Sequence, residues 1–133
     1  MTTRLRLMRA QRLLKVQEQM RNLAERDLAD TRAKAAKVET DRAAMLATLA
    51  GETMHGLFLD AAARRLRALA GEATELAATA VRQTATVQAR GLAEKRAERQ
   101  AEGLVRLRAH EREQADMLEQ LDLMVARAGT RQD

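Results

Sequence analysis

The fold is decided by residues 13–49, which read LLKVQEQMRNLAERDLADTRAKAAKVETDRAAMLATL. Apolar or small side chains recur in this stretch at steps of three and four residues. These positions are Leu13, Val16, Met20, Ala24, Leu28, Thr31, Ala35, Val38, Arg42, Met45 and Leu49. Such spacing is typical of the buried seam of a coiled coil. Consecutive steps of four between residues 16 and 28 predict a stutter, which would locally relax the supercoil.

A second, sparser series of apolar residues follows residue 70. It comprises Ala73, Leu76, Ala80, Val87, Ala97, Ala101 and Leu104, and, after a phase slip near Leu104, Leu107, Glu111, Gln114, Leu118, Leu121, Val125 and Ala128. Residues 79–87 are rich in β-branched side chains but are flanked by Ala-rich helix, so we expect them to be helical. Two long helices that each carry one apolar stripe should fold back on each other, since neither buries its stripe alone.

The sequence therefore predicts an all-α fold, with two long helices in an antiparallel coiled-coil hairpin. Residues 1–133 form a single elongated unit, with the first helix at about 3–50 and both termini at one end. The string GETMHG at 51–56 contains two glycines and is the predicted turn. Residues 57–70 either continue the second helix, which is then longer than the first and overhangs at its C-terminal end, or form a separate cap. The second helix ends at about 128, before Gly129 and a polar tail at 129–133.

The composition disfavours an enzyme. The chain has no Cys, Pro, Trp or Tyr and a single aromatic residue, Phe58, while 32% of its residues are charged. It also lacks Ser, so the serine and cysteine nucleophiles of covalent catalysis and thiolate metal ligands are missing. His55 and His110 are the two histidines, and neither has a second His at metal-site spacing. No Gly-rich phosphate-binding string occurs, so we expect no catalytic, metal or cofactor site.

The charge is concentrated at the N-terminus. The net charge is +5, and the first 17 residues contain no acidic residue. This segment carries the cations Arg4, Arg6, Arg9, Arg12 and Lys15. Nucleic acid, an anionic membrane or an acidic protein groove could bind such an arm. Specific nucleic-acid binding is not expected, because the basic arm contains no aromatic side chain on which bases could stack.

Two further expectations follow from the pattern. Antiparallel folding would bring the basic arm near a group of carboxylates on the second helix. These are Glu111, Glu113, Asp116, Glu119 and Asp122. No run of 18 apolar residues occurs, so the sequence predicts no transmembrane helix.

Both ends of the chain resemble a known family. Residues 4–34 read RLRLMRAQRLLKVQEQMRNLAERDLADTRAK, and residues 93–129 read AEKRAERQAEGLVRLRAHEREQADMLEQLDLMVARAG. An Arg/Leu-rich opening helix and a closing leucine-acidic-leucine element followed by Arg127 are similar to the flagellar export protein FliJ family. The stalk proteins of type III secretion injectisomes are similar in the same features, so the flagellar and injectisome systems are not separated.

The resemblance implies a function. Proteins of this family are antiparallel coiled-coil stalks of the type III export apparatus, cytoplasmic and peripheral to the inner membrane through that apparatus. They insert into the central pore of the hexameric export ATPase, contact the cytoplasmic part of the export gate and escort export chaperones. On this reading the basic arm, Arg4 to Lys15, would engage the ATPase.

The resemblance also suggests a gate-binding region near the turn. The residues in that region are Met45, Leu49, Phe58, Leu66 and Leu69. The alternative for these five residues is that they only pack the hairpin turn. The alternative for the whole chain is a basic coiled-coil protein that binds nucleic acid or an anionic membrane surface.

Overall fold

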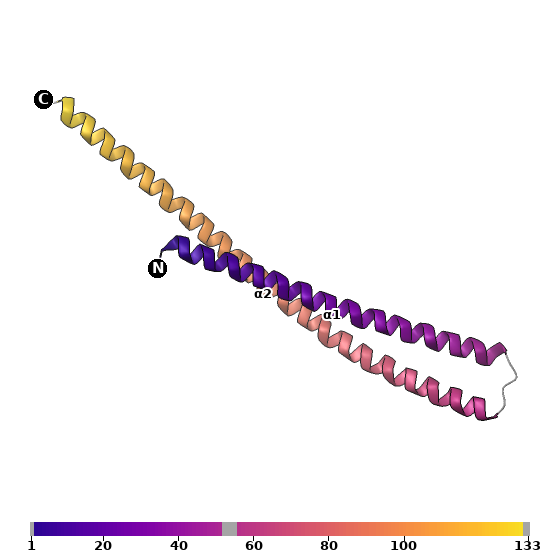
Figure 1. Cartoon of the computed structure of the whole chain (residues 1–133). Helices are drawn as coiled ribbons and strands as arrows, with labels where there is room; N and C mark the ends of the chain where they lie inside the picture. Colours follow the sequence, from indigo (N-terminus) through magenta and orange to yellow (C-terminus); the bar gives the residue numbers. More distant parts are fainter. Residues whose placement is uncertain (1, 52–55, 132–133) are drawn as a thin grey trace. The chain divides into compact units, whose positions relative to one another are not determined.

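The computed structural model of the chain describes residues 2–51 and 56–131. Helix α1 spans Thr3–Gly51 and helix α2 spans Gly56–Arg131 (Figure 1). The helices pack against each other in opposite directions, so the predicted all-α helical hairpin is confirmed. Thr2 caps α1, because its hydroxyl accepts a hydrogen bond from the Leu5 amide at 3.4 Å.

The element boundaries refine the prediction. Residues 57–70 lie inside α2, so they continue the second helix and form no separate cap. Helix α2 runs to Arg131 and passes through Gly129, so the predicted end at residue 128 was too early. A glycine in a helix interior costs only about 1 kcal/mol relative to Ala, and the described glycines have no positive φ that would break the helix. Residues 52–55 of the predicted turn, His55 included, and residues 132–133 of the predicted tail lie outside the described residues.

The buried face of α1 follows one uninterrupted three-four pattern. Its buried or half-buried positions include Leu7, Ala10, Leu14, Gln17, Arg21, Ala24, Leu28, Thr31, Ala35, Val38, Met45 and Leu49. From Ala24 onward these are the predicted seam residues, apart from Arg42, which is exposed. Before Ala24 the prediction holds for Met20, which is half-buried, and is wrong for the two residues that precede it in the series. Leu13 and Val16 are 44% and 47% exposed, and Leu14 and Gln17 face α2 instead. The pattern therefore needs no stutter.

The buried face of α2 keeps the same period. Its buried or half-buried positions include Ala62, Leu66, Leu69, Ala73, Leu76, Ala80, Gln83, Val87, Arg90, Glu94, Ala97, Ala101, Leu104 and Arg108. The β-branched segment is helical, as expected. The hydroxyls of Thr79, Thr84 and Thr86 donate to carbonyls four residues earlier, at 3.0, 2.7 and 3.1 Å. These bonds satisfy the hydroxyls within the helix and leave the backbone pattern intact.

The chain divides into two compact units. Unit 1 comprises Met1–Glu18 and Leu92–Asp133, and unit 2 comprises Gln19–Gly91. In unit 1, Leu7 and Ala10 of α1 pack on Ala101 and Leu104 of α2. In unit 2, Leu69 is the most deeply buried large side chain, at 1% exposure. Many seam positions are alanines, which bring the helix backbones close but bury little area.

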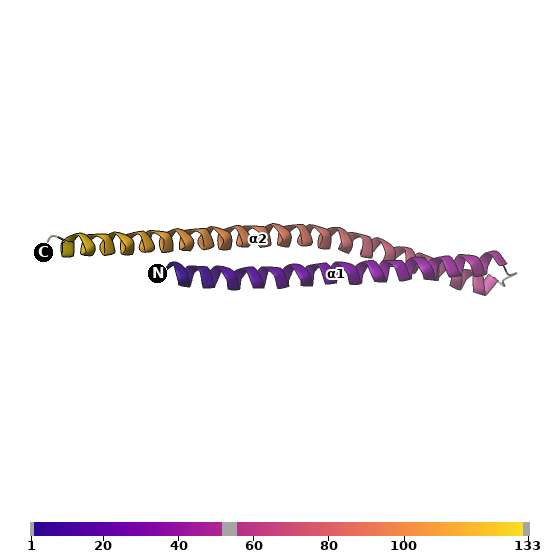
Figure 2. The same ribbon diagram turned by 90° about the horizontal axis from the view of Figure 1, so that it is seen from above.

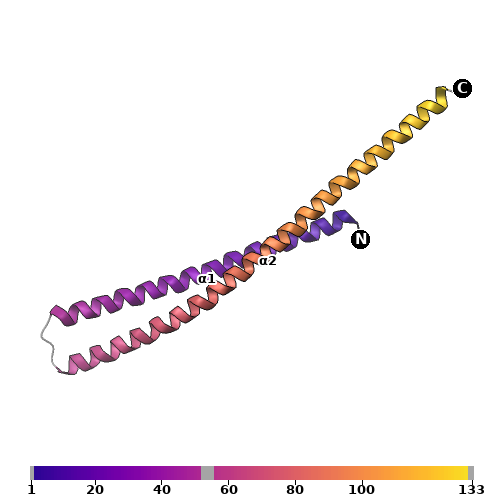
Figure 3. The same cartoon turned by 180° about the vertical axis from the view of Figure 1, so that it is seen from behind.

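Unit 1 contains both chain ends and fixes where α1 begins along α2. The Thr3 hydroxyl donates to Glu111 Oε1 at 2.7 Å, so the first turn of α1 lies beside Glu111. Helix α2 continues past this point, and its C-terminal end extends beyond the start of α1 (Figures 2 and 3). Residues 112–131, here called the C-terminal overhang, have no counterpart in α1. At 1.5 Å per residue this overhang is about 30 Å long.

Candidate partner-binding surfaces

The predicted basic arm is an exposed surface of unit 1. The side chains of Arg4, Arg6, Arg9, Arg12 and Lys15 are all exposed. The arm is held as a helix because Leu7, Ala10 and Leu14 pack its other face on α2. Arg6 and Arg9 border an open groove of about 410 Å³ whose other lining residues are Ala10, Leu13, Gln100 and Leu104.

The predicted charge pairing between the two ends of the hairpin is mostly absent. Glu111 lies beside the arm, where its carboxylate accepts the hydrogen bond from Thr3. Glu113, Asp116, Glu119 and Asp122 are exposed on the C-terminal overhang, past the start of α1. The prediction failed for these four carboxylates because α1 begins too late along α2 to reach them. The cations of the arm are therefore not opposed by these carboxylates within the chain.

The five residues suggested for the gate lie in unit 2 and differ in accessibility. Leu69 is fully buried, so it packs the hairpin and cannot contact a partner while the helices are paired. Met45, Leu49 and Leu66 are half-buried. Phe58 is 62% exposed. It lies between two further exposed leucines at the start of α2, Leu57 at 83% and Leu59 at 49%.

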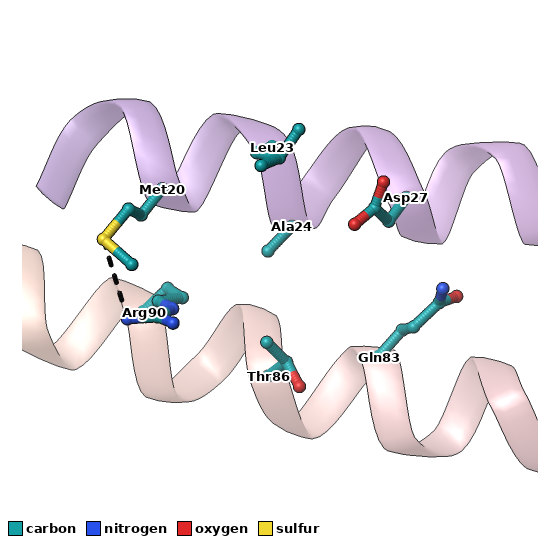
Figure 4. A pocket seen from close by; sticks show the side chains of 7 residues that line it. All are labelled: Met20, Leu23, Ala24, Asp27, Gln83, Thr86 and Arg90. Carbon is teal, nitrogen blue, oxygen red and sulfur yellow. Dashed lines mark hydrogen bonds between the residues drawn. The ribbon is translucent and has the colours of Figure 1, made fainter. Parts of the chain in front are cut away.

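Unit 2 also has a polar interruption in its seam (Figure 4). The open cavity there has a volume of about 240 Å³ and is lined by Met20, Leu23, Ala24, Asp27, Gln83, Thr86 and Arg90. Arg90 Nη1 approaches Met20 Sδ at 3.8 Å. Gln83 Oε1 is buried and has no hydrogen-bond partner among the described residues. The same holds for Gln17 Oε1 in unit 1. The apolar repeat did not predict this feature, because the polar seam residues Gln83 and Arg90 are not part of that repeat.

The C-terminal overhang is one of the two alternatives that the unequal helix lengths left open. The predicted seam nevertheless included Leu118, Leu121 and Val125, whereas every residue from 109 to 130 is exposed. The large apolar side chains there are Met117 at 62%, Leu118 at 63%, Leu121 at 54%, Leu123 at 57%, Met124 at 65% and Val125 at 71%. The usable signal was the length difference between the helices, since 49 residues cannot cover 76.

Comparison with known proteins adds no relative. No family model, curated protein or solved structure matches the chain. Within residues 2–51 and 56–131, no group of three or more His, Asp or Glu side chains is placed to hold a metal ion. In the same residues, neither helix contains a stretch long and apolar enough to cross a bilayer. The chain is thus defined by its fold, a helical hairpin, and by three exposed surfaces: the basic arm, the Phe58 region and the overhang.

Proposed function

We propose that the chain is a non-enzymatic coiled-coil stalk and adaptor of the flagellar type III export apparatus, or of the related injectisome. It would act in the cytoplasm, at the inner membrane through the apparatus, without a cofactor. The observation that carries this proposal is the exposed, acid-free arm at the start of α1, which is paired with α2 in unit 1. A helical segment that inserts into a ring needs such a surface, with charges directed sideways from the helix axis.

The distribution of the arm's cations supports a surrounding partner. At about 100° per residue, positions 4, 6, 9, 12 and 15 spread over a little more than half of the helix circumference. This covers the surface of the arm that does not pack on α2. A flat acidic patch would engage only part of this array, whereas the pore of a hexameric ATPase would engage all of it. Arg guanidinium groups suit such a pore because they donate to carboxylates and backbone carbonyls in a fork.

The gate contact is best placed on the exposed residues near the turn. Phe58 presents an aromatic ring to solvent, and Leu57 and Leu59 extend the apolar surface. Met45, Leu49 and Leu66 contribute only their exposed portions, and Leu69 is left to the hairpin core. Export chaperones are the third class of partner, to which the chain would act as an escort.

The ATPase contact is tested by reversing charges on the arm. Arg6, Arg9 and Arg12 are changed together to Glu, and binding to the purified hexameric export ATPase is measured across a salt series. The matched control changes Arg26, Arg32 and Arg42 to Glu, which are exposed cations of unit 2. We expect the arm variant to lose about tenfold or more in affinity and most of its salt dependence, and the control to stay within about twofold.

Helicity is measured beside binding, because Glu at these sites adds like-charge contacts. If both variants keep full helicity and bind the ATPase equally well, the arm is not the docking surface and the stalk proposal fails. The competing class, a basic coiled coil for nucleic acid or anionic membrane, rests on the same exposed arm. Retention on DNA at about 0.3 M salt without ATPase association would favour that class, since non-specific binding falls steeply with salt.

A further inference from the structure

The C-terminal overhang carries an apolar stripe that is distinct from the hairpin seam. Met117, Leu121 and Met124 lie along one side of α2, with Leu118 and Val125 beside them. At about 100° per residue, Met117, Leu121 and Met124 are turned by nearly half a turn from the face that Ala101 and Leu104 present to α1, and Leu118 and Val125 lie between the two faces. The stripe is therefore not a simple continuation of the seam, and its side chains are 54–71% exposed.

The charges on the overhang restrict what can cover this stripe. Residues 113–126 contain Glu113, Asp116, Glu119 and Asp122 and no Lys or Arg. Glu113 and Asp122 flank the stripe on its two edges at helical spacing. Nucleic acid and anionic lipid would be repelled by these carboxylates. The surface that fits the stripe must combine apolar side chains with cations.

The arm of unit 1 has such a surface on its outer face. Leu5 at 50%, Met8 at 40% and Val16 at 47% are exposed on the side of α1 opposite the seam. Arg9 and Arg12 lie between them and are exposed as well. The first acidic residue is Glu18, so this face carries cations without carboxylates over its whole length. The arm thus has two apolar faces, and only one of them is packed on α2.

We infer that two copies of the chain associate through their ends, each laying its C-terminal overhang on the outer face of the other's arm. The occupant is a second copy, because the outer face of the arm combines exposed apolar side chains with cations, whereas the overhang of the same chain leads away from that arm. The contact is reciprocal and closes with twofold symmetry, so it forms a dimer and not a filament. This inference does not depend on the export role.

The lengths and directions agree with this arrangement. The overhang is about 30 Å long, and the acid-free arm, residues 3–17, is about 22 Å long. In a twofold pair that meets at its ends, the overhang of one chain runs parallel to α1 of the other. Glu113 then lies near Arg4 of the partner copy, Leu121 near Arg12 and Val125 near Val16.

The size of the contact explains why it must be reciprocal. One helix strip of this length buries about 600 Å² in total, which is the size of a non-specific crystal contact. Two such strips bury about 1,200 Å², the lower end of specific interfaces. The dimer is therefore weak and concentration-dependent. It covers the basic arm, so dimerisation and binding of the arm to any other acidic partner exclude each other.

Cross-linking tests which surfaces meet. The chain contains no cysteine, so introduced thiols are the only ones present. A V16C chain is mixed with a V125C chain and oxidised. The matched control replaces V125C with V81C, because Val81 and Val125 are both 71% exposed. We expect a disulfide-linked pair from V16C with V125C and none from V16C with V81C, since a disulfide needs Cα atoms within about 7 Å.

Light scattering over a concentration series tests the energetics. The L121E chain should remain monomeric where the unchanged chain dimerises. The L123E chain should still dimerise, because Leu123 is equally exposed, at 57%, but lies on the other side of α2. The pair R4E/R12E should also be monomeric, and adding E113R and D122R to it should restore the dimer, because Glu113 lies near Arg4 and Asp122 near Arg12 in this register.

Several outcomes would overturn the inference. The unchanged chain could be a monomer at all concentrations, or L123E could disrupt the dimer as strongly as L121E. Self-cross-linking of V125C without any product from V16C and V125C would show that two overhangs pair with each other and that the arm is not the occupant. Helicity of L121E should be unchanged, since Leu121 is exposed within its own chain.

Discussion

Replacing Gln83 with leucine should stabilise the hairpin. Gln83 occupies a seam position of α2, and its side chain extends from α2 towards α1 in the vicinity of Asp27 (Figure 4). Its Oε1 atom is buried without a hydrogen-bond partner in the described residues. Leucine has a similar reach, removes the unsatisfied acceptor and adds apolar area to the cavity that Ala24 also lines.

The magnitude follows from the loss of the unsatisfied acceptor and the gain of apolar burial. An unsatisfied buried acceptor costs about 1–3 kcal/mol. Gln83 is only half-buried, so we expect the lower part of that range, with part of a leucine's burial free energy added. The net gain in the free energy of unfolding is about 1–2 kcal/mol. For a chain of this length, that raises Tm by about 3–10 °C.

The assay is urea unfolding followed by far-UV circular dichroism. Gln83→Ala removes the amide without filling its space, so its stability should lie between those of the unchanged chain and Gln83→Leu. Gln88→Leu is the control, because Gln88 is exposed on the same helix, and we expect a change within about 0.5 kcal/mol. If Gln83→Leu is no more stable than Gln88→Leu, the buried amide is satisfied by solvent and the reasoning is refuted.

Further substitutions test other features of the helices by the same unfolding measurement. Leu69→Ala should lower the free energy of unfolding by about 2–5 kcal/mol, because Leu69 is 1% exposed. Leu59→Ala, at 49% exposure, should lower it by less than about 1 kcal/mol. Equal losses would contradict the placement of the core. Gly91→Ala should gain about 0.5–1 kcal/mol, since an added Cβ meets nothing within 4 Å, and a loss would indicate a close contact at that position. Glu25→Gln breaks the 3.0 Å ion pair with Arg21. It should lower the free energy of unfolding by less than about 0.5 kcal/mol, because both side chains are partly exposed. A larger loss that persists in high salt would show that the pair is not a screened surface pair.

Periodicity identified the seam where each helix has a single apolar stripe. From Ala24 to Leu49 the three-four steps matched the buried positions, apart from Arg42. In the basic arm it failed, because two stripes compete there. Leu13 and Val16 form the more apolar series, but Leu14 and Gln17 are in phase with Leu7 and Ala10, which pack on α2. The arm's position in the seam is therefore set by its partner helix and not by its own hydrophobicity.

Some features of the candidate surfaces could likewise be predicted from the sequence, and others required the structure. Exposure of the basic arm followed from the sequence, because five cations cannot be buried without partners. The burial of Leu69 and the exposure of Phe58 could not be separated by sequence, since both are large apolar residues near the turn. The two side chains differ in exposure because they lie on different sides of α2. Which side is buried depends on where α1 packs, and the sequence of α2 alone does not give that.

By itself, the sequence determined that this chain forms two long helices that pair in opposite directions. The absence of proline, the helix-forming composition and the spacing of apolar side chains give two helices with one stripe each, and the glycines near residues 51–56 allow them to pair within the chain. Only the tertiary structure decided where α1 begins along α2. That register depends on small, distributed contacts between the helices, such as Ala10 on Ala101, which no single helix encodes. The register leaves the C-terminal overhang uncovered, because the first turn of α1 lies beside Glu111 and α2 continues for about 30 Å beyond it.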